Sequence, residues 1–216
     1  CGLDEPVPVA ATGRTDAGVH AEMQVVGFRL PVDRTPHQVM SGINFHTPAD
    51  ITCLAAQTMA DDFSPRRWTK GKLYRYRILN RLPHCPFRDD LVWHVKSPLN
   101  VGAMSAAIAA LVGQHDFSSF RAAGCSADTT VRTIRAARCQ ATDDGEVLIE
   151  FEGPGFLRHQ VRIMVGTLVD VGLGKRSAGE VASTLSAQDR ATAGPTAPAK
   201  GLTLAQVEVG DGPRDL

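Results

Sequence analysis

The sequence predicts an α+β fold, in which antiparallel or mixed sheets carry helices packed on one face. Residues 72–80 alternate between two sets of side chains with the period of two that is typical of strands. Asp143, Asp144 and Gly145 join two further alternating segments, which indicates a hairpin. Apolar residues recur at helical spacing in residues 100–112 and 156–171. Hairpins combined with separate helices favour the α+β class.

The first third of the chain combines short strands with one helix. Apolar runs predict strands at residues 7–11, 24–30 and 51–58. Thr35 followed by Pro36 is a typical helix start, because threonine is a good N-cap and proline suits the first helical position. We therefore expect a short helix that runs through Ile43, and a loop at residues 61–66.

The rest of the chain supplies the longer elements. In the strand at residues 72–80, Tyr74 and Tyr76 share one face and Arg75 lies on the other. Asn100 is expected to cap the helix at residues 100–112. The other expected elements are strands at residues 131–142, 146–152 and 201–209, a helix at residues 177–186 and a loop at residues 191–200.

A helix is also expected at residues 156–171, after the break formed by Gly153, Pro154 and Gly155. Its apolar side chains form a stripe, as expected for a helix that packs on a core. Arg158 and Arg162 are four residues apart and would share one face of this helix. Two arginines are unusual on a mostly apolar helix, although an arginine at the edge of a core can extend its charged end to solvent.

Composition limits the classes of protein to which the chain can belong. The 216 residues are enough for one large or two small domains, and the 43% hydrophobic content supports a core. No apolar run approaches the ~18 residues of a membrane helix, and no signal peptide is recognisable. The five cysteines have no paired short spacing, which argues against a zinc site and a disulfide framework and fits the cytoplasm. We expect no metal and no cofactor.

The net charge is zero, with 23 basic and 23 acidic residues, yet one segment is strongly basic. Residues 63–88 contain no Asp or Glu, and a local basic stripe on a neutral protein can be a nucleic-acid footprint. An ordinary solvated face explains the stripe equally well. The cations of this basic stripe are Arg66, Arg67, Lys70, Lys72, Arg75, Arg77, Arg81 and Arg88.

The polar segment of residues 13–21 lies between two strand-like runs and carries one carboxylate, Asp16, between Gly13 and Gly18. Glycine allows sharp turns and close approach to a ligand, and an aspartate held in this way can act as a nucleophile. The residues alone favour a plainer role, because Asp in a glycine-flanked turn commonly accepts hydrogen bonds from backbone N–H groups.

Three motifs nevertheless resemble the TruA family of bacterial tRNA pseudouridine synthases. Residues 13–21 match the catalytic signature of that family without a gap. Tyr74 matches an active-site tyrosine, counted from the element at residues 63–66. The third motif matches at Phe156, His159, Val161, Arg162 and Gly166. The resemblance implies that Asp16 is the nucleophile, that Tyr74 lies against the target base and that Arg162 pairs with Asp16.

The resemblance also implies an architecture. The family has two ferredoxin-like (RRM-like) halves, whose sheets merge into one curved sheet with the active cleft between the halves. We expect an N-terminal catalytic-loop half at residues 1–66, without the first strand and helix that precede this point in the family, and a C-terminal half at residues 67–216 with the active-site Tyr and Arg. A cytoplasmic homodimer without a membrane segment is implied in the same way.

The implied reaction isomerises uridine to pseudouridine in the anticodon stem-loop of tRNA, with no cofactor. A base in a stem must be flipped out before it can react. Arg14 could then fill the vacated space or contact phosphate, and Tyr74 could stack on the base. The other candidate RNA-binding residues are Arg66, Arg67, Lys70, Lys72, Arg158 and His159.

The resemblance leads to one predicted contact, for which Arg162 is the candidate because its motif matches that of the family and it has no local acidic partner on an otherwise apolar face. A flipped base would exclude water from Asp16, and burial disfavours an ionised carboxylate unless a cation offsets it. Arginine suits this role because it stays charged and can bind a carboxylate through two N–H groups. We therefore expect Arg162 within about 4 Å of Asp16.

Three other functions remain open from the sequence. A non-catalytic RNA-binding module would use exposed aromatic side chains on a ferredoxin-like sheet. A synthase of the same family could act on a different RNA. A glycosidase would need two carboxylates about 5–9 Å apart, and no second acidic residue accompanies Asp16 in the matched motifs.

Overall fold

The structure is a computed structural model that describes residues 6–125 and 127–213. Its chain divides into two compact units that are not continuous in sequence. Unit 1 consists of residues 6–13, 25–69 and 209–213, and unit 2 of residues 14–24 and 70–208. The predicted boundary at residue 66 lies close to the junction between Thr69 and Lys70, whereas the segment Arg14–Gln24 belongs to unit 2.

Unit 1 has little regular structure. Strands β1 (Ala10–Ala11) and β3 (Val26–Gly27) pair antiparallel. Helix α1 (Pro36–His46) begins where the sequence predicts, and a capping box between Thr35 and Gln38 closes its first turn. Helix α2 (Pro65–Trp68) is a single turn, and the Trp68 ring contacts Phe63 edge-on.

The strand predicted at residues 51–58 is wrong, because this segment forms neither helix nor strand. Its apolar side chains do not line a buried face, since Ile51 is 55% exposed and Leu54 76% exposed. An apolar run predicts a strand only where another strand and a core are available to it. The strands predicted at residues 7–11 and 24–30 are confirmed only as the two-residue pairs of β1 and β3.

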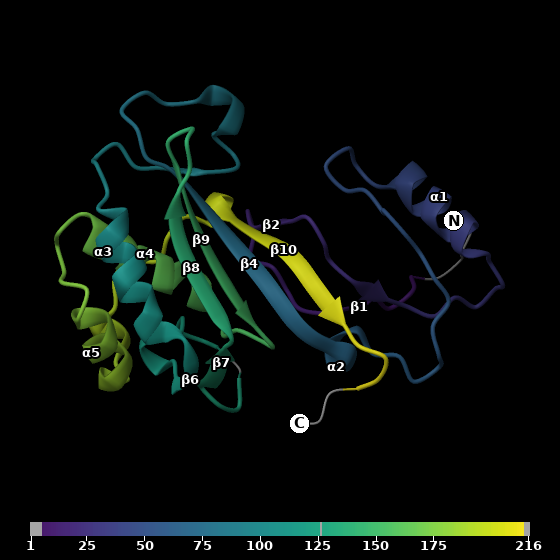
Figure 1. The fold of residues 1–216 in the computed structure, drawn as a ribbon. Helices are drawn as coiled ribbons and strands as arrows, with labels where there is room; N and C mark the ends of the chain where they lie inside the picture. Colours follow the sequence, from purple (N-terminus) through teal and green to yellow (C-terminus); the bar gives the residue numbers. More distant parts are fainter. Residues whose placement is uncertain (1–5, 126, 214–216) are drawn as a thin grey trace. The chain divides into compact units, whose positions relative to one another are not determined.

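Unit 2 is built around a six-stranded mixed sheet, with the strand order β2-β10-β4-β9-β8 and β5 paired with β4 (Figure 1). β9 pairs antiparallel with both β4 and β8, whereas β2 is parallel to β10 and β5 is parallel to β4. The strands are β2 (His20–Ala21), β4 (Thr69–Leu79), β5 (Trp93–His94), β8 (Ala136–Ala141), β9 (Glu146–Gly153) and β10 (Leu202–Val209).

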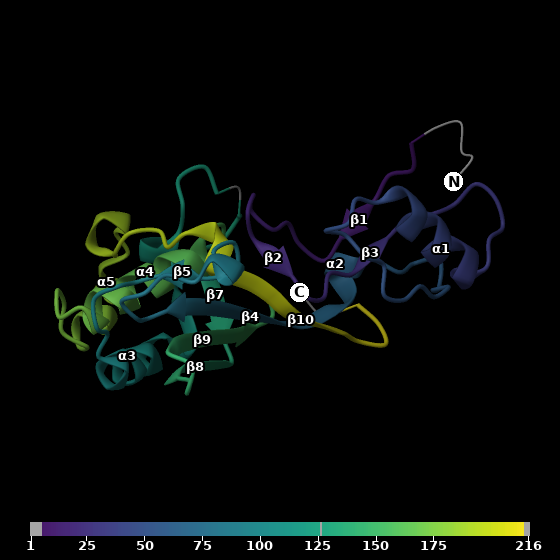
Figure 2. The same cartoon turned by 90° about the horizontal axis from the view of Figure 1, so that it is seen from above.

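Three helices lie together beside this sheet in both ribbon views (Figures 1 and 2). They are α3 (Val101–Ile108), α4 (Gln160–Gly172) and α5 (Glu180–Ala187). Asn100 caps α3 as predicted, because its side chain accepts a hydrogen bond from the N–H of Ala103. Short pieces complete the unit, namely strands β6 (Gly113–Asp116) and β7 (Val131–Ile134) and the 3₁₀ turns Pro86–Arg88, Ala109–Leu111, Ser118–Phe120, Arg190–Thr192 and Ala199–Gly201.

The two faces of β4 differ as the alternation predicts. Tyr76 and Ile78 are fully buried in the core that the sheet shares with α3, α4 and α5. The Tyr76 hydroxyl donates a hydrogen bond to the carbonyl oxygen of Pro198 at 2.7 Å. Arg75 and Arg77 instead form ion pairs with acidic residues of neighbouring segments. Together these elements confirm the α+β class, with a mixed sheet and packed helices.

Two predicted elements need correction. The helix predicted from residue 156 begins only at Gln160, because His159 adopts the left-handed conformation (φ 60°) that interrupts a helix. Arg158 therefore precedes the helix and does not share a helical face with Arg162. The strand predicted at residues 131–142 is divided at Arg135, since β7 pairs with β6 while β8 pairs with β9.

Candidate active site

The segment Arg14–Gln24 is attached to the sheet of unit 2. The N–H of Val19 bonds to the carbonyl oxygen of Asp16 at 3.0 Å, and this turn includes Gly18 at a φ of +78°. Most side chains are strained at such a φ, so glycine suits the position. The chain then forms β2, which pairs with β10, and the N–H of Glu22 bonds to the carbonyl oxygen of Leu204. Asp16 is therefore held by a short loop whose far end is a sheet strand.

The predicted contact between Asp16 and Arg162 is confirmed. Arg162 Nη1 donates to Asp16 Oδ2 at 3.2 Å, across 146 positions of sequence. The Arg162 side chain is 15% exposed and that of Asp16 is 30% exposed, so the pair is largely shielded but open to a ligand. The positive charge of Arg162 therefore lies directly against the carboxylate of Asp16.

The backbone around Ala197 holds Arg162 in place. Arg162 Nε donates to the carbonyl oxygen of Ala197 at 2.8 Å, and the N–H of Ala197 donates to the carbonyl oxygen of Arg162 at 3.1 Å. With Nε engaged by a carbonyl, the guanidinium has one orientation in which it can present Nη1 to Asp16. The sequence did not predict these two hydrogen bonds with Ala197, because it indicated only a loop at residues 191–200.

His159 is a second partner of Asp16. From the sequence, this histidine was predicted only as an RNA-binding residue. Its Nε2 lies 3.3 Å from Asp16 Oδ2. Burial lowers the pKa of His159, Arg162 and Arg158 lower it further, and Asp16 opposes them. His159 is therefore neutral at physiological pH, so the arginine supplies the charge and the histidine a polar contact. Its place three residues before Arg162 in the matched motif was the available sequence signal.

Tyr74 lies on β4 within electrostatic reach of Asp16. Burial, and then the negative charge of Asp16, raise the pKa of Tyr74 to about 12. The phenol therefore keeps its proton at physiological pH. Its ring packs edge-on against Phe156, with the ring centroids 5.2 Å apart. Asp16, Tyr74, His159 and Arg162 thus come together within unit 2.

The other candidate RNA-binding residues are spread over the chain. Arg14 and Arg158 are exposed residues of unit 2. Lys70 and Lys72 are half-buried at the start of β4. Arg66 and Arg67 are exposed on α2 and belong to unit 1.

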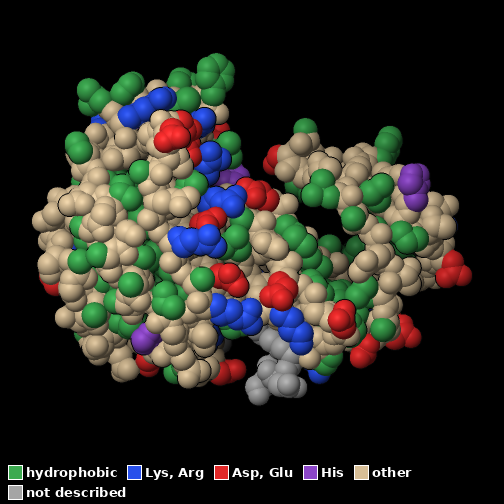
Figure 3. Space-filling view, in the orientation of Figure 1, with side chains coloured by type: hydrophobic (Ala, Val, Ile, Leu, Met, Phe, Trp, Pro, Cys, Tyr) green, Lys and Arg blue, Asp and Glu red, His purple; other side chains and the backbone are tan. Residues whose placement is uncertain are grey.

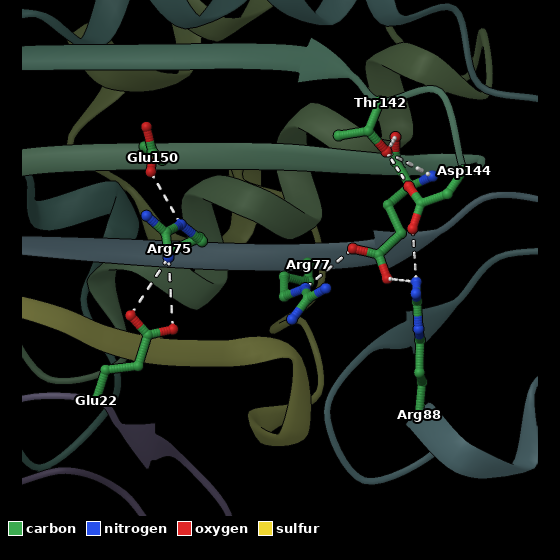
Figure 4. Close-up of polar contacts among 8 residues, drawn as sticks. Glu22, Arg75, Arg77, Arg88, Thr142, Asp144 and Glu150 are labelled. Carbon is green, nitrogen blue, oxygen red and sulfur yellow. Dashed lines mark hydrogen bonds and ion pairs between the residues drawn. The ribbon is translucent and has the colours of Figure 1, made fainter.

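The basic stripe is largely compensated where it crosses the sheet. Arg75 lies between Glu22 and Glu150, with nitrogen–oxygen distances of 3.4 and 3.0 Å (Figure 4). Figure 3 shows the result, a band in which basic and acidic side chains are interleaved. The acidic partners come from other strands and turns, so a count along residues 63–88 overstates the positive charge of this face.

Glu146 lies at the other end of this band, and its side chain is only 2% exposed. It accepts from Arg77 at 2.9 Å and from Arg88 at 2.6 Å. Arg88 also binds Asp144, whose other carboxylate oxygen accepts from the hydroxyl of Thr142 (Figure 4). A carboxylate this buried needs such partners, because an unpaired buried charge is strongly destabilising.

Two features are absent from residues 6–125 and 127–213. No helix there is long and apolar enough to cross a membrane. In the same part of the chain, no three His, Cys, Asp or Glu side chains are grouped so that they could hold a metal ion.

Comparison with known proteins gives consistent matches. A family model described as tRNA pseudouridine synthase matches residues 107–208, a range that includes Arg162 but not Asp16 or Tyr74. Proteins named tRNA pseudouridine synthase A match nearly the whole chain. The one from Myxococcus xanthus is 48% identical over 98% of this chain and 80% of its own length. Those from Acidiphilium cryptum and Geobacter sulfurreducens are 47% and 45% identical, over 100% and 95% of this chain and 85% and 84% of their own lengths.

Proposed function

The chain belongs to the tRNA pseudouridine synthase A family, and on that premise we propose that it isomerises uridine to pseudouridine in the anticodon stem-loop of tRNA. The observation that carries the proposal is the arrangement of Asp16 beside Arg162, His159 and Tyr74. The isomerase class follows from the family. The residue roles and the RNA position are our inference from this arrangement and from the three sequence motifs.

The reaction balances without a cofactor. The bond between uracil N1 and the ribose C1′ breaks, the base turns while it is held, and C5 bonds to C1′. C5 loses a proton and N1 gains one, so the product has the mass of the substrate. The protein has to supply a nucleophile or base at the sugar, a surface that retains the free uracil, and groups that move protons.

Asp16 is the group that we assign to the first task. Its carboxylate either attacks the sugar or base, or removes a sugar proton to give a glycal. Both routes need the ionised form, and the charged Arg162 faces that carboxylate at 3.2 Å. His159 at 3.3 Å is neutral and limits the directions in which the carboxylate can turn.

Tyr74 is assigned to the second task. Flipping a stacked nucleotide costs a few kcal/mol, and stacking on an aromatic ring returns roughly 1–3 kcal/mol. The edge-on contact with Phe156 fixes the plane of the Tyr74 ring and leaves its hydroxyl to act on the base. Arg14, exposed two residues before Asp16, is placed to contact the RNA backbone or to fill the space that the base leaves.

The remaining family expectations stay predictions. They are the two ferredoxin-like halves with one merged sheet, the division of the chain at residue 66, the homodimer, the cytoplasmic location and the contribution of the basic stripe to tRNA binding.

The test is Asp16→Asn with tRNA that carries tritium at C5 of uridine. Each turnover releases the C5 proton, so tritium release counts turnovers. We expect release to fall below detection while tRNA binding changes little, because the phosphate contacts lie elsewhere. Asp33→Asn is the matched control, since Asp33 is an exposed aspartate of unit 1, and this variant should retain full activity.

Two outcomes would count against the proposal. Appreciable turnover by Asp16→Asn would remove Asp16 from the chemistry. Tight tRNA binding by the unmodified protein, with no tritium release from any uridine, would instead favour a non-catalytic RNA-binding module.

A further inference from the structure

A surface cavity of about 480 Å³ lies in unit 2, apart from the four side chains of the candidate active site. It is formed by the segment at residues 118–125 and by the turn at residues 188–190. The residues of its wall that matter here are Arg121, Gly124, Cys125, Asp189 and Arg190. The cavity is large enough for a phosphate group and part of its ribose, but small for a folded protein element.

The charge of this wall favours an anion. Within residues 6–125 and 127–213, the Arg121 guanidinium makes no ion pair and no hydrogen bond. The Arg190 guanidinium is held by the carbonyl oxygens of Ala193 and Gly194 at 3.4 and 3.0 Å, and it keeps its charge. The single carboxylate, Asp189, accepts from the N–H of Ala191 in its own turn.

The surroundings of Cys125 favour negative charge in the same way. Burial by itself would raise the pKa of this thiol. Hydrogen bonds from the backbone N–H groups of Arg158 and Ala127, together with the charges of Arg121 and Arg132, nevertheless bring its pKa below the ordinary value. The groups that favour a thiolate here would equally favour a phosphate oxygen.

The cavity is joined to the candidate active site through Arg158. The N–H of Ala122 donates to the carbonyl oxygen of Arg158 at 3.1 Å. Arg158 Nη1 lies 3.7 Å from the place where a side chain on Gly124 would begin. The next residue, His159, contacts Asp16. One short segment therefore touches the cavity on one side and the Asp16 carboxylate on the other.

We propose that this cavity binds a backbone phosphate of the RNA strand that carries the target uridine, with Arg121 as its principal cation. The inference rests on the proposed function and adds a subsite to it. A nucleotide that is flipped out must have its flanking backbone held, and arginine is well suited to phosphate because its planar fork can form two parallel hydrogen bonds.

The first experiment measures tRNA affinity against salt for the full chain and for Arg121→Gln. Loss of one phosphate contact should flatten the slope of log affinity against log salt by about 0.7–0.9. Arg138→Gln is the matched control, because Arg138 lies on β8 outside this cavity and its side chain is 66% exposed. We expect the control to keep the slope of the unmodified protein. Equal slopes for Arg121→Gln and the unmodified protein would overturn the proposal.

The second experiment follows alkylation of the cysteines by iodoacetamide, read by mass spectrometry. Saturating tRNA should slow the modification of Cys125 at least several-fold. Cys85, which is half-buried and lies outside the cavity, is the internal reference and should not be slowed. Unchanged modification of Cys125 in the presence of bound tRNA would contradict the assignment. Equal protection by inorganic phosphate at the same total phosphate would assign the site to free phosphate and likewise overturn it.

Failure of this inference can be distinguished from failure of the proposed function. If the unmodified protein releases tritium from uridine while Arg121→Gln keeps its slope and Cys125 stays accessible, only the cavity assignment is wrong. If no tritium is released although tRNA protects Cys125, the subsite stands and the catalytic proposal fails.

Discussion

Asp16 shares one oxygen between two neighbours of different character. Oδ2 lies 3.2 Å from a permanently charged guanidinium and 3.3 Å from an imidazole whose pKa is lowered. Below its pKa the imidazole would become a second cation and compete with Arg162 for the same oxygen. At physiological pH it does not, so one cation and one polar contact define the direction of the carboxylate.

Tyr74→Phe tests whether the phenol does more than stack. The ring and its contact with Phe156 persist in this variant, so tRNA binding should survive. If the hydroxyl moves a proton, the rate of tritium release should fall by roughly 10²–10⁴, the usual effect of losing a general acid or base.

The pH profile adds a second check. With a pKa of about 12, Tyr74 stays protonated, and its titration should add no descending limb to the profile between about pH 7 and 10. Near-normal rates for Tyr74→Phe would reduce this residue to a stacking surface.

At this scale the matched motifs predicted the pairing of Asp16 with Arg162, which spacing alone could not have done across 146 positions. The matched motif contained His159 but did not predict its contact with Asp16, because the backbone φ of 60° at this residue cannot be read from a local sequence pattern. The carbonyl of Ala197 was out of reach for another reason. Every residue has a carbonyl, so the sequence carries no mark of the one that Arg162 uses.

Helix α4 approaches a neighbouring backbone segment closely at Gly166. A side chain on Gly166 would begin 1.8 Å from the carbonyl oxygen of Pro195, so only glycine allows this approach. The segment that it meets, residues 195–198, also holds Arg162 and accepts from the Tyr76 hydroxyl. Packing of the helix and orientation of the arginine therefore depend on one backbone contact.

Gly166→Ala should displace that segment. Overpacking of this kind typically costs about 1–3 kcal/mol, and a backbone oxygen cannot turn away as a side chain can. We expect a lower free energy of unfolding together with reduced activity, measured by denaturant titration and tritium release.

Gly179→Ala is the control for this variant. A side chain there would meet nothing within 4 Å, so stability should be unchanged or slightly higher. If Gly166→Ala were as stable and active as this control, the contact with Pro195 would have no importance for the site.

Elements defined by local chemistry could be predicted, and those defined by partners could not. The caps at Thr35 and Asn100 and the hairpin turn at residues 143–145 are local, and each forms as expected. Phe156 shows the opposite case. It is the first residue of the predicted helix, but its ring packs against Tyr74 before the observed helix begins at Gln160. The strand predicted at residues 51–58 failed because it has no buried face.

For the whole molecule, a net charge of zero hides an uneven distribution. Arg75, Arg77 and Arg88 of the basic stripe are paired with acids, and this pairing depends on the register of β4 with β9. The register of β4 with β9 cannot be predicted from the order of residues in the basic stripe alone. We therefore expect these three arginines to contribute little to binding of the proposed RNA substrate.

Arg67→Gln tests this view through the salt dependence of tRNA affinity. Arg67 is exposed on α2, and losing a phosphate contact there should flatten the slope by about 0.7–0.9. Arg75→Gln removes the same charge from a compensated position and should leave the slope unchanged. Identical slopes for the two variants would mean that pairing does not decide which cations meet RNA.

The loop with Asp16 also has a consequence for how the protein can be altered. Residues 14–24 and 70–208 form one unit, while residues 25–69 between them belong to the other. Along the sequence, most of unit 1 is thus an insertion between Asp16 and Arg162, which form an ion pair in the structure. An insertion of this kind can be lengthened, shortened or exchanged as long as the two segments that flank it in unit 2 are held by their own contacts. Here β2 on β10 holds one end and β4 on β9 the other, so we expect that residues 25–69 can change in length while Asp16 and Arg162 stay paired.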